Sequence, residues 1–198
     1  MSDSANHFLN GLIFGEQAES DPRLRELVLY IADKSYEDGG FGAIKLNKII
    51  YFSDFESYAR YGQLITGSDY ISLPNGPAPK RLIPVRKQMV EGHEISIRNV
   101  SYYGKEQHRV IPLRDANLML FTARDIAIVD AVIDKHWGKT ARQMSDLSHD
   151  RIWRIAGTTG APIPKEAVFI SSEDLTDYDI QRTRELAAEH GWRERERI

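Results

Sequence analysis

The chain has 198 residues, a formal net charge of −3 and 41% hydrophobic residues, values typical of one soluble globular domain. Cysteine is absent, which excludes disulfides, thiolate metal sites and thiol nucleophiles. The slight negative charge argues against a dedicated nucleic-acid binder. Because no apolar run could span a bilayer and no secretory signal is recognisable, the expected location is the cytoplasm.

The N-terminal part of the chain predicts a flexible arm followed by a helix. Residues 1–20 are polar with a small apolar patch. Asp21 and Pro22 are typical of a helix start, with aspartate at the N-cap and proline at the first helical position. Apolar residues then recur at helical spacing, so we expect a helix to about Tyr36 and a glycine-rich loop over 38–42.

The stretch 44–61 predicts a long helix at the centre of the domain. It carries two apolar arcs, and a helix of this kind packs against neighbours on two sides. Lys45 falls on the most polar side of the helical wheel. Lys48 and Asp54 fall within or between the apolar arcs, so we expect them to be buried and hydrogen-bonded or charge-paired.

After the central helix the sequence predicts a stop, a turn and a short strand. Gly62 is expected to end the helix in the left-handed conformation. A turn at 66–69 and a strand at 70–73 follow. Residues 74–79 form a breaker segment, with Pro77 near the first turn of the next helix.

The middle of the chain predicts a small antiparallel sheet. Residues 94–100 alternate polar and apolar side chains, and 108–113 form the returning strand, so a β-hairpin is expected near 94–113. The strand at 70–73 is a candidate third member of this sheet. The expected fold class is α+β, mainly α-helical, with a helical domain around the buried central helix.

Two helix starts follow the hairpin. Thr122 opens the first with a weak capping box, and Thr140 opens the second with a cleaner one. A loop over 157–164 and a last amphipathic helix from Thr176 complete the prediction. The expected organisation is a single domain over 21–192 between the N-terminal arm and a charged tail at 193–198.

Motifs of known catalytic or cofactor-binding chemistry are missing from the sequence. There is no P-loop, no Rossmann glycine fingerprint, no HExxH and no GxSxG. The six histidines stand apart, without a carboxylate or a second histidine at metal-ligand spacing. We therefore assign no catalytic, cofactor-binding or metal-binding residue and expect that the protein is not an enzyme.

A specific order of residues runs from Lys45 to Pro79. The helix reads K-L-x-K-I-I-Y-F-x-D, the turn reads I-T-G-x-x-Y, and G-P-A-P follows. This order resembles the Panacea domain family of SocA-like antitoxins and phage-associated proteins, most strongly over 22–92. Ser53 and Ala78 are small departures from the family pattern. The matching residues, expected to be mainly structural, are Lys45, Leu46, Lys48, Tyr51, Phe52, Asp54, Gly62, Thr66, Gly67, Tyr70, Gly76 and Pro77.

The resemblance implies an antitoxin that neutralises a cognate toxin by direct protein–protein binding. In one branch of the family the antitoxin also delivers the toxin to a ClpXP-type protease. Because interface hot spots favour aromatic side chains, Phe41, Tyr102 and Tyr103 are the candidates for partner contact, together with the C-terminal helix.

Two alternatives to the antitoxin function stay open. The first is a proteolytic adaptor or phage-derived interaction protein without a toxin. The second is a small-ligand-binding protein or enzyme with a buried polar site at Lys48 and Asp54.

Overall fold

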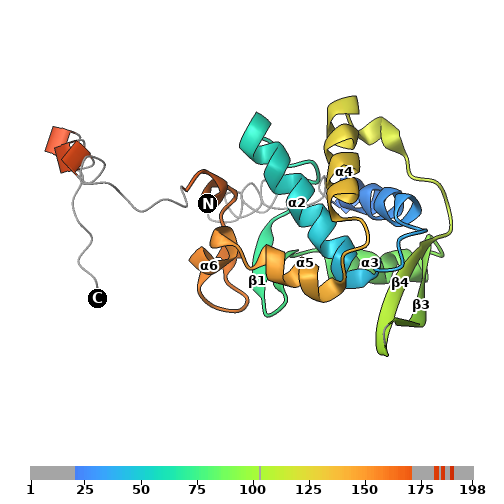
Figure 1. The fold of residues 1–198 in the computed structure, drawn as a ribbon. Helices are drawn as coiled ribbons and strands as arrows, with labels where there is room; N and C mark the ends of the chain where they lie inside the picture. The colour runs from blue at the N-terminus through green and yellow to red at the C-terminus, as the bar shows by residue number, and fades with distance from the viewer. Residues whose placement is uncertain (1–20, 103, 171–180, 183, 186–187, 190–198) are drawn as a thin grey trace, which may run out of the picture.

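The fold is α+β and mainly helical, as the sequence predicts, and α2 (Ala43–Tyr61) lies at its centre in Figure 1. The predicted arm, the charged tail and most of the last predicted helix lie outside the residues described by this computed structural model. The structure describes residues 21–102, 104–170, 181–182, 184–185 and 188–189.

The hydrophobic core forms around α2 and the helix over residues 21–34. α4 (Ala123–His136) and α5 (Ala141–Ser148) also pack against α2, so the central helix is buried as predicted. Gly62 ends α2 with φ 72°, in the predicted left-handed conformation.

The helical wheel was wrong about Lys45, whose side chain is only 1% exposed. Its ammonium group donates to Asp38 Oδ2 at 2.5 Å and to the carbonyl oxygen of Lys139 at 2.9 Å. Burial lowers the pKa of Lys45, and the hydrogen bond with Asp38 opposes that effect. The loop after the first helix folds back over the start of α2, and a wheel of one helix cannot show such a contact.

Two separate small sheets replace the single sheet that the sequence suggested. β1 (Tyr70–Leu73) lies between β2 (Gly76–Pro79) and β5 (Pro162–Ile163), and all three are antiparallel. The predicted hairpin forms β3 (Ile95–Tyr102) and β4 (Lys105–Pro112). The expectation that strand 70–73 joins the hairpin was therefore wrong.

Pro77 also departs from its predicted position. It does not begin a helix but lies in β2, opposite Ser72. Because β2 is the edge strand of its sheet, a proline without an N–H group is tolerated there. The next helix, α3 (Leu82–Glu91), starts after this strand and carries Pro84 in its first turn.

The later elements follow the predicted helix starts. Thr122 and Thr140 each form a complete capping box, at the start of α4 and of α5. Short elements fill the remaining connections: η1 (Leu118–Leu120), α6 (Arg151–Ala156) and η2 (Lys165–Phe169). The predicted loop at 157–164 was wrong in part, because its end forms β5 on the edge of β1.

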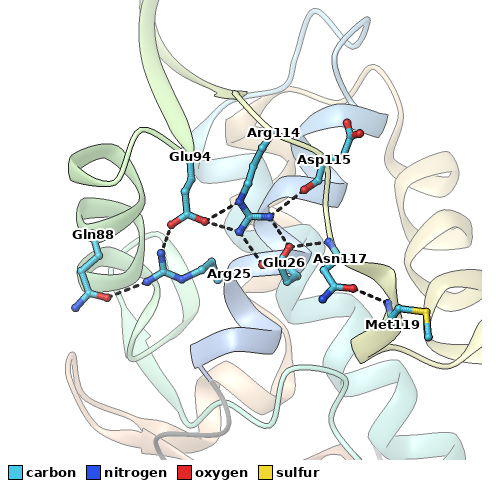
Figure 2. Close-up of polar contacts among 8 residues, drawn as sticks. All are labelled: Arg25, Glu26, Gln88, Glu94, Arg114, Asp115, Asn117 and Met119. Carbon is cyan, nitrogen blue, oxygen red and sulfur yellow. Dashed lines mark hydrogen bonds and ion pairs between the residues drawn. The ribbon is translucent and has the colours of Figure 1, made fainter.

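An ion-pair network fastens the base of the hairpin to the first helix (Figure 2). Arg114, just after β4, donates to both carboxylate oxygens of Glu26, at 2.7 and 2.8 Å, and also to Glu94. The backbone N–H of Asn117 donates to Glu26 at 2.7 Å. Burial alone would raise the pKa of Glu26, but the bonds from Arg114 and Asn117 lower it overall. The hairpin is thus held at a defined place on the helical body.

No helix in the described ranges combines the length and the hydrophobicity of a membrane span.

Candidate functional site

Asp54 on α2 is fully buried and accepts three hydrogen bonds from the segment after the helix. Its carboxylate accepts from the backbone N–H of Thr66 at 2.8 Å, from the Tyr70 hydroxyl at 2.7 Å, and from the Thr66 hydroxyl. Burial raises the pKa of Asp54 to about 6, while the bonds from Thr66 and Tyr70 lower it. Asp54 therefore ties α2 to the following turn, in which Gly67 has φ 71°.

Lys48 is equally buried, and its ammonium group donates to the carbonyl oxygen of Pro77 at 2.8 Å. The side-chain amide of Asn47 donates to the same oxygen at 3.1 Å. Burial lowers the pKa of Lys48 to about 7, and the negative charge of Asp150 opposes this shift. Lys48 thus holds β2 against α2 from inside the domain.

Tyr51 connects α2 to α6 through its hydroxyl group. The hydroxyl donates to Asp150 Oδ2 at 2.8 Å, and Asp150 also caps α6 by accepting from the backbone N–H of Trp153 at 3.1 Å. The Tyr51 ring packs 4.7 Å from the ring of Phe55 and 5.8 Å from that of Tyr70. Burial, followed by the charge of Asp150, raises the pKa of Tyr51, so its hydroxyl stays protonated.

Asp150 was not predicted to be a partner of Tyr51. The one signal in the sequence was its place as a candidate N-cap before residues 151–156. Nothing local indicates that this cap lies beside α2, because the two residues are far apart along the chain.

An apolar groove of about 300 Å³ lies between α2, α4 and the segment from α5 to η2. Its lining includes Phe52, Phe55, Val132, His136, Ile152 and Val168. Neither Lys48 nor Asp54 lines this groove. The two residues predicted as a polar ligand site therefore lie outside this groove.

His136 is a buried titratable side chain of the groove, with 5% exposure. Its ring stacks on that of Phe52, with centroids 4.9 Å apart. Burial lowers the pKa of His136 to about 4, and the positive charges of Lys139 and Lys135 add to the shift. The imidazole is therefore neutral at neutral pH. Among the described residues, no group of three or more potential ligands is placed to hold a metal ion.

The remaining residues of the sequence pattern are parts of the fold. Leu46 is fully buried in the core, and Phe52 is half-buried at the groove. Gly76 begins β2 with φ 95°, where an added Cβ would lie 2.2 Å from Ser148 Oγ. The pattern thus specifies how α2, the turn and β2 pack together.

The predicted partner-contact residues have different positions. The prediction for Phe41 was wrong, since its side chain is 0% exposed and belongs to the core under its loop. Tyr102 is half-buried, and its ring lies against Gly39, where an added Cβ would be 3.3 Å from Tyr102 Cε2. Tyr103 lies outside the described residues.

We expect Asp54 to make the protein more stable by about 1–3 kcal/mol as the pH falls from about 7 to about 4. Its pKa in the folded chain is about 6, above the ordinary value of 3.8, so the folded chain binds this proton at a higher pH than the unfolded chain does. Urea unfolding of the wild type and of Asp54→Asn across this range measures the effect. A stability difference between the two proteins that does not change with pH would contradict the expectation.

Comparison with known proteins gives one match. A family model described as "Antitoxin SocA-like, Panacea domain" matches residues 46–154, which is more than half of the chain. No curated protein and no solved structure matches the chain significantly.

Proposed function

Because the chain belongs to the Panacea domain family of SocA-like antitoxins, we propose that it neutralises a cognate toxin by direct protein–protein binding. The observation that carries the proposal is the family match over residues 46–154. A shared fold does not identify the partner, so the toxin has to be found by experiment.

We propose further that Lys48 and Asp54 act in the fold and not in catalysis. Both side chains are 0% exposed, and neither lines the groove. A general acid or base has to come within hydrogen-bond distance of its substrate. The polar atoms of both residues are instead engaged with Thr66, Tyr70 and Pro77 inside the domain.

The test is expression of the protein encoded by the neighbouring gene, alone and together with this chain. We expect arrested growth when the neighbouring protein is produced alone, and rescued growth and a co-purifying complex when both are produced. If no neighbouring protein is toxic, or none co-purifies, the antitoxin function is refuted. Comparing toxin levels with and without a ClpXP-type protease separates simple neutralisation from delivery for degradation.

Lys48→Met tests the ligand-site alternative in the same assay. Methionine keeps most of the volume of lysine, and Asn47 still donates to the Pro77 carbonyl. We expect this variant to fold and to rescue growth like the wild type. A folded Lys48→Met protein that no longer rescues growth would favour the ligand-site alternative.

A further inference from the structure

The outer edge of β3 has backbone groups that no other strand covers. Tyr102 pairs with Lys105, and only two residues separate them in the sequence, so the N–H and C=O groups of Tyr102 point toward β4. In an antiparallel pair the backbone groups of successive residues point alternately toward and away from the partner strand. The N–H and C=O groups of Ile97, Asn99 and Ser101 therefore point away from β4. All three residues are exposed, and their outward groups make no backbone hydrogen bond within the described part of the chain.

The outer edge of β4 is shielded, in contrast to that of β3. At Gly42 an added Cβ would lie 3.3 Å from the carbonyl oxygen of His108, which places the start of α2 against this edge. Pro112 at the end of β4 has no N–H group to offer another strand. The hairpin therefore presents one open edge, on β3.

One face of the hairpin carries positive charges that the protein itself does not neutralise. Arg98 lies directly opposite Arg109, and Lys105 shares their face. None of the three forms an ion pair with a described carboxylate, and Arg109 donates instead to the backbone carbonyl of Tyr36. Like charges directly opposite each other destabilise a strand pair, so this face favours an external negative charge.

We propose that the open edge of β3 binds an extended acidic segment of the toxin, which adds to the hairpin as a third strand. The segment pairs with the outward N–H and C=O groups of Ile97, Asn99 and Ser101. A carboxylate of the segment lies over Arg98 and Arg109 and removes their mutual repulsion. This inference rests on the proposed antitoxin function, because it assigns the binding surface for the same partner.

The position of the hairpin supports this type of binding. The hairpin projects from the helical body with β3 on its outer side (Figure 1), and the bonds of Arg114 to Glu26 and Glu94 hold its base (Figure 2). An edge that is already ordered loses little conformational freedom when a strand is added.

Other occupants fit this surface less well. A second copy of this chain, paired through its own β3 edge, would bring two basic faces side by side. A nucleic acid could neutralise Arg98 and Arg109 with phosphates, but its backbone would not pair with the outward carbonyl groups. An acidic protein strand satisfies both the charges and the backbone groups.

The first test compares Asn99→Pro with Asn99→Ala in the full-length chain, with the toxin from the neutralisation assay as the probe. Proline removes an outward N–H group that the hairpin does not use. Alanine keeps this group, and both changes remove the 2.7 Å contact between Asn99 Oδ1 and His108 Nδ1. We expect at least tenfold weaker toxin binding for Asn99→Pro and less than a threefold change for Asn99→Ala, measured by calorimetry.

The second test is Arg98→Glu. It replaces the like-charge pair with Arg109 by an opposite-charge pair, so we expect a higher thermal midpoint for the free protein and at least tenfold weaker toxin binding. Arg151→Glu makes the same change of charge at an exposed position on α6 and is expected to leave binding within threefold. Weaker binding with a higher midpoint separates loss of the contact from loss of the fold.

Amide hydrogen exchange followed by NMR locates the contact. In the free protein the amides of Arg98 and Val100 should be protected by β4, whereas those of Ile97, Asn99 and Ser101 should exchange quickly. Binding of the toxin is expected to slow exchange at these three amides by at least tenfold. Unchanged exchange there, with protection elsewhere, would overturn the strand-addition proposal.

The outcomes distinguish this inference from the proposed function. If the wild type, Asn99→Pro and Arg98→Glu neutralise the toxin equally well, the antitoxin function stands and the β3 edge is not its surface. If the wild type binds no neighbouring protein, the proposed function fails and this inference fails with it. Binding of duplex DNA that depends on Arg98, with toxin binding unaffected by Arg98→Glu, would also overturn it.

Discussion

Replacing Asp54 with alanine is expected to lower the free energy of unfolding by about 3–4 kcal/mol, a large share of the roughly 5–15 kcal/mol that stabilises a typical domain. The carboxylate accepts three hydrogen bonds, from the N–H and hydroxyl groups of Thr66 and from the hydroxyl of Tyr70. Alanine leaves these three donors buried without an acceptor, and such donors cost about 1–3 kcal/mol each. Alanine also removes the free-energy cost of burying a charged carboxylate, and this offsets part of the loss. Denaturant unfolding at neutral pH measures the effect.

Two further variants divide this effect among the bonds. Tyr70→Phe removes only the hydroxyl donor and is expected to cost about 1–2 kcal/mol. Asp54→Asn keeps the shape and one acceptor oxygen, so its cost should lie between the two. If Asp54→Ala is no more destabilising than Tyr70→Phe, the hydrogen bonds from Thr66 to Asp54 contribute nothing to stability. Asp54 would then not tie α2 to the following turn.

Gly76→Ala is expected to destabilise the protein by about 3 kcal/mol or more. The glycine has φ 95°, a conformation that alanine rarely adopts. The added Cβ would also lie 2.2 Å from Ser148 Oγ and 2.8 Å from Lys48 Nζ, so β2 would have to move away from α2 and α5. Thermal and denaturant unfolding measure the change.

Gly62→Ala is the matched control for the backbone conformation. Gly62 has φ 72°, but nothing lies within 4 Å of an added Cβ, so we expect a cost of only about 1 kcal/mol. Adding Ser148→Ala to Gly76→Ala removes the nearest clashing atom and should recover at least about 1 kcal/mol. Equal effects of Gly76→Ala and Gly62→Ala would show that the close approach of β2 to Ser148 and Lys48 does not constrain the fold.

These predictions concern the part of the chain that carries the family pattern. Asp54, Lys48 and Gly76 lie inside the domain and hold α2, the turn and β2 together. Because a fold pattern does not identify a partner, we propose that partner contacts are made by exposed segments such as β3.

Local patterns in the sequence correctly predicted most of the helices and the hairpin. The capping boxes at Thr122 and Thr140, and Gly62 as the end of α2, depend on contacts within one turn of chain. The alternation over 94–100 likewise involves only neighbouring residues of one segment, and that segment forms β3. Signals of this kind are visible in the sequence because the interacting residues are close along the chain.

The pairing of distant segments could not be predicted in the same way. Pro77 lies in an edge strand because β1 pairs with it, and β5 forms because residues 162–163 reach the other side of β1. A two-residue strand such as β5 has no periodicity of its own, so only the tertiary structure reveals it.

The sequence by itself determined the family, the central buried helix and most of the positions where helices start and stop, since all of these follow from short-range spacing. Only the tertiary structure decided that Lys45 and Phe41 are buried, that Lys48 and Asp54 lie outside the groove, and that Arg98 faces Arg109. Burial and charge pairing depend on which remote segment covers a residue, and neither helical nor strand periodicity carries that information.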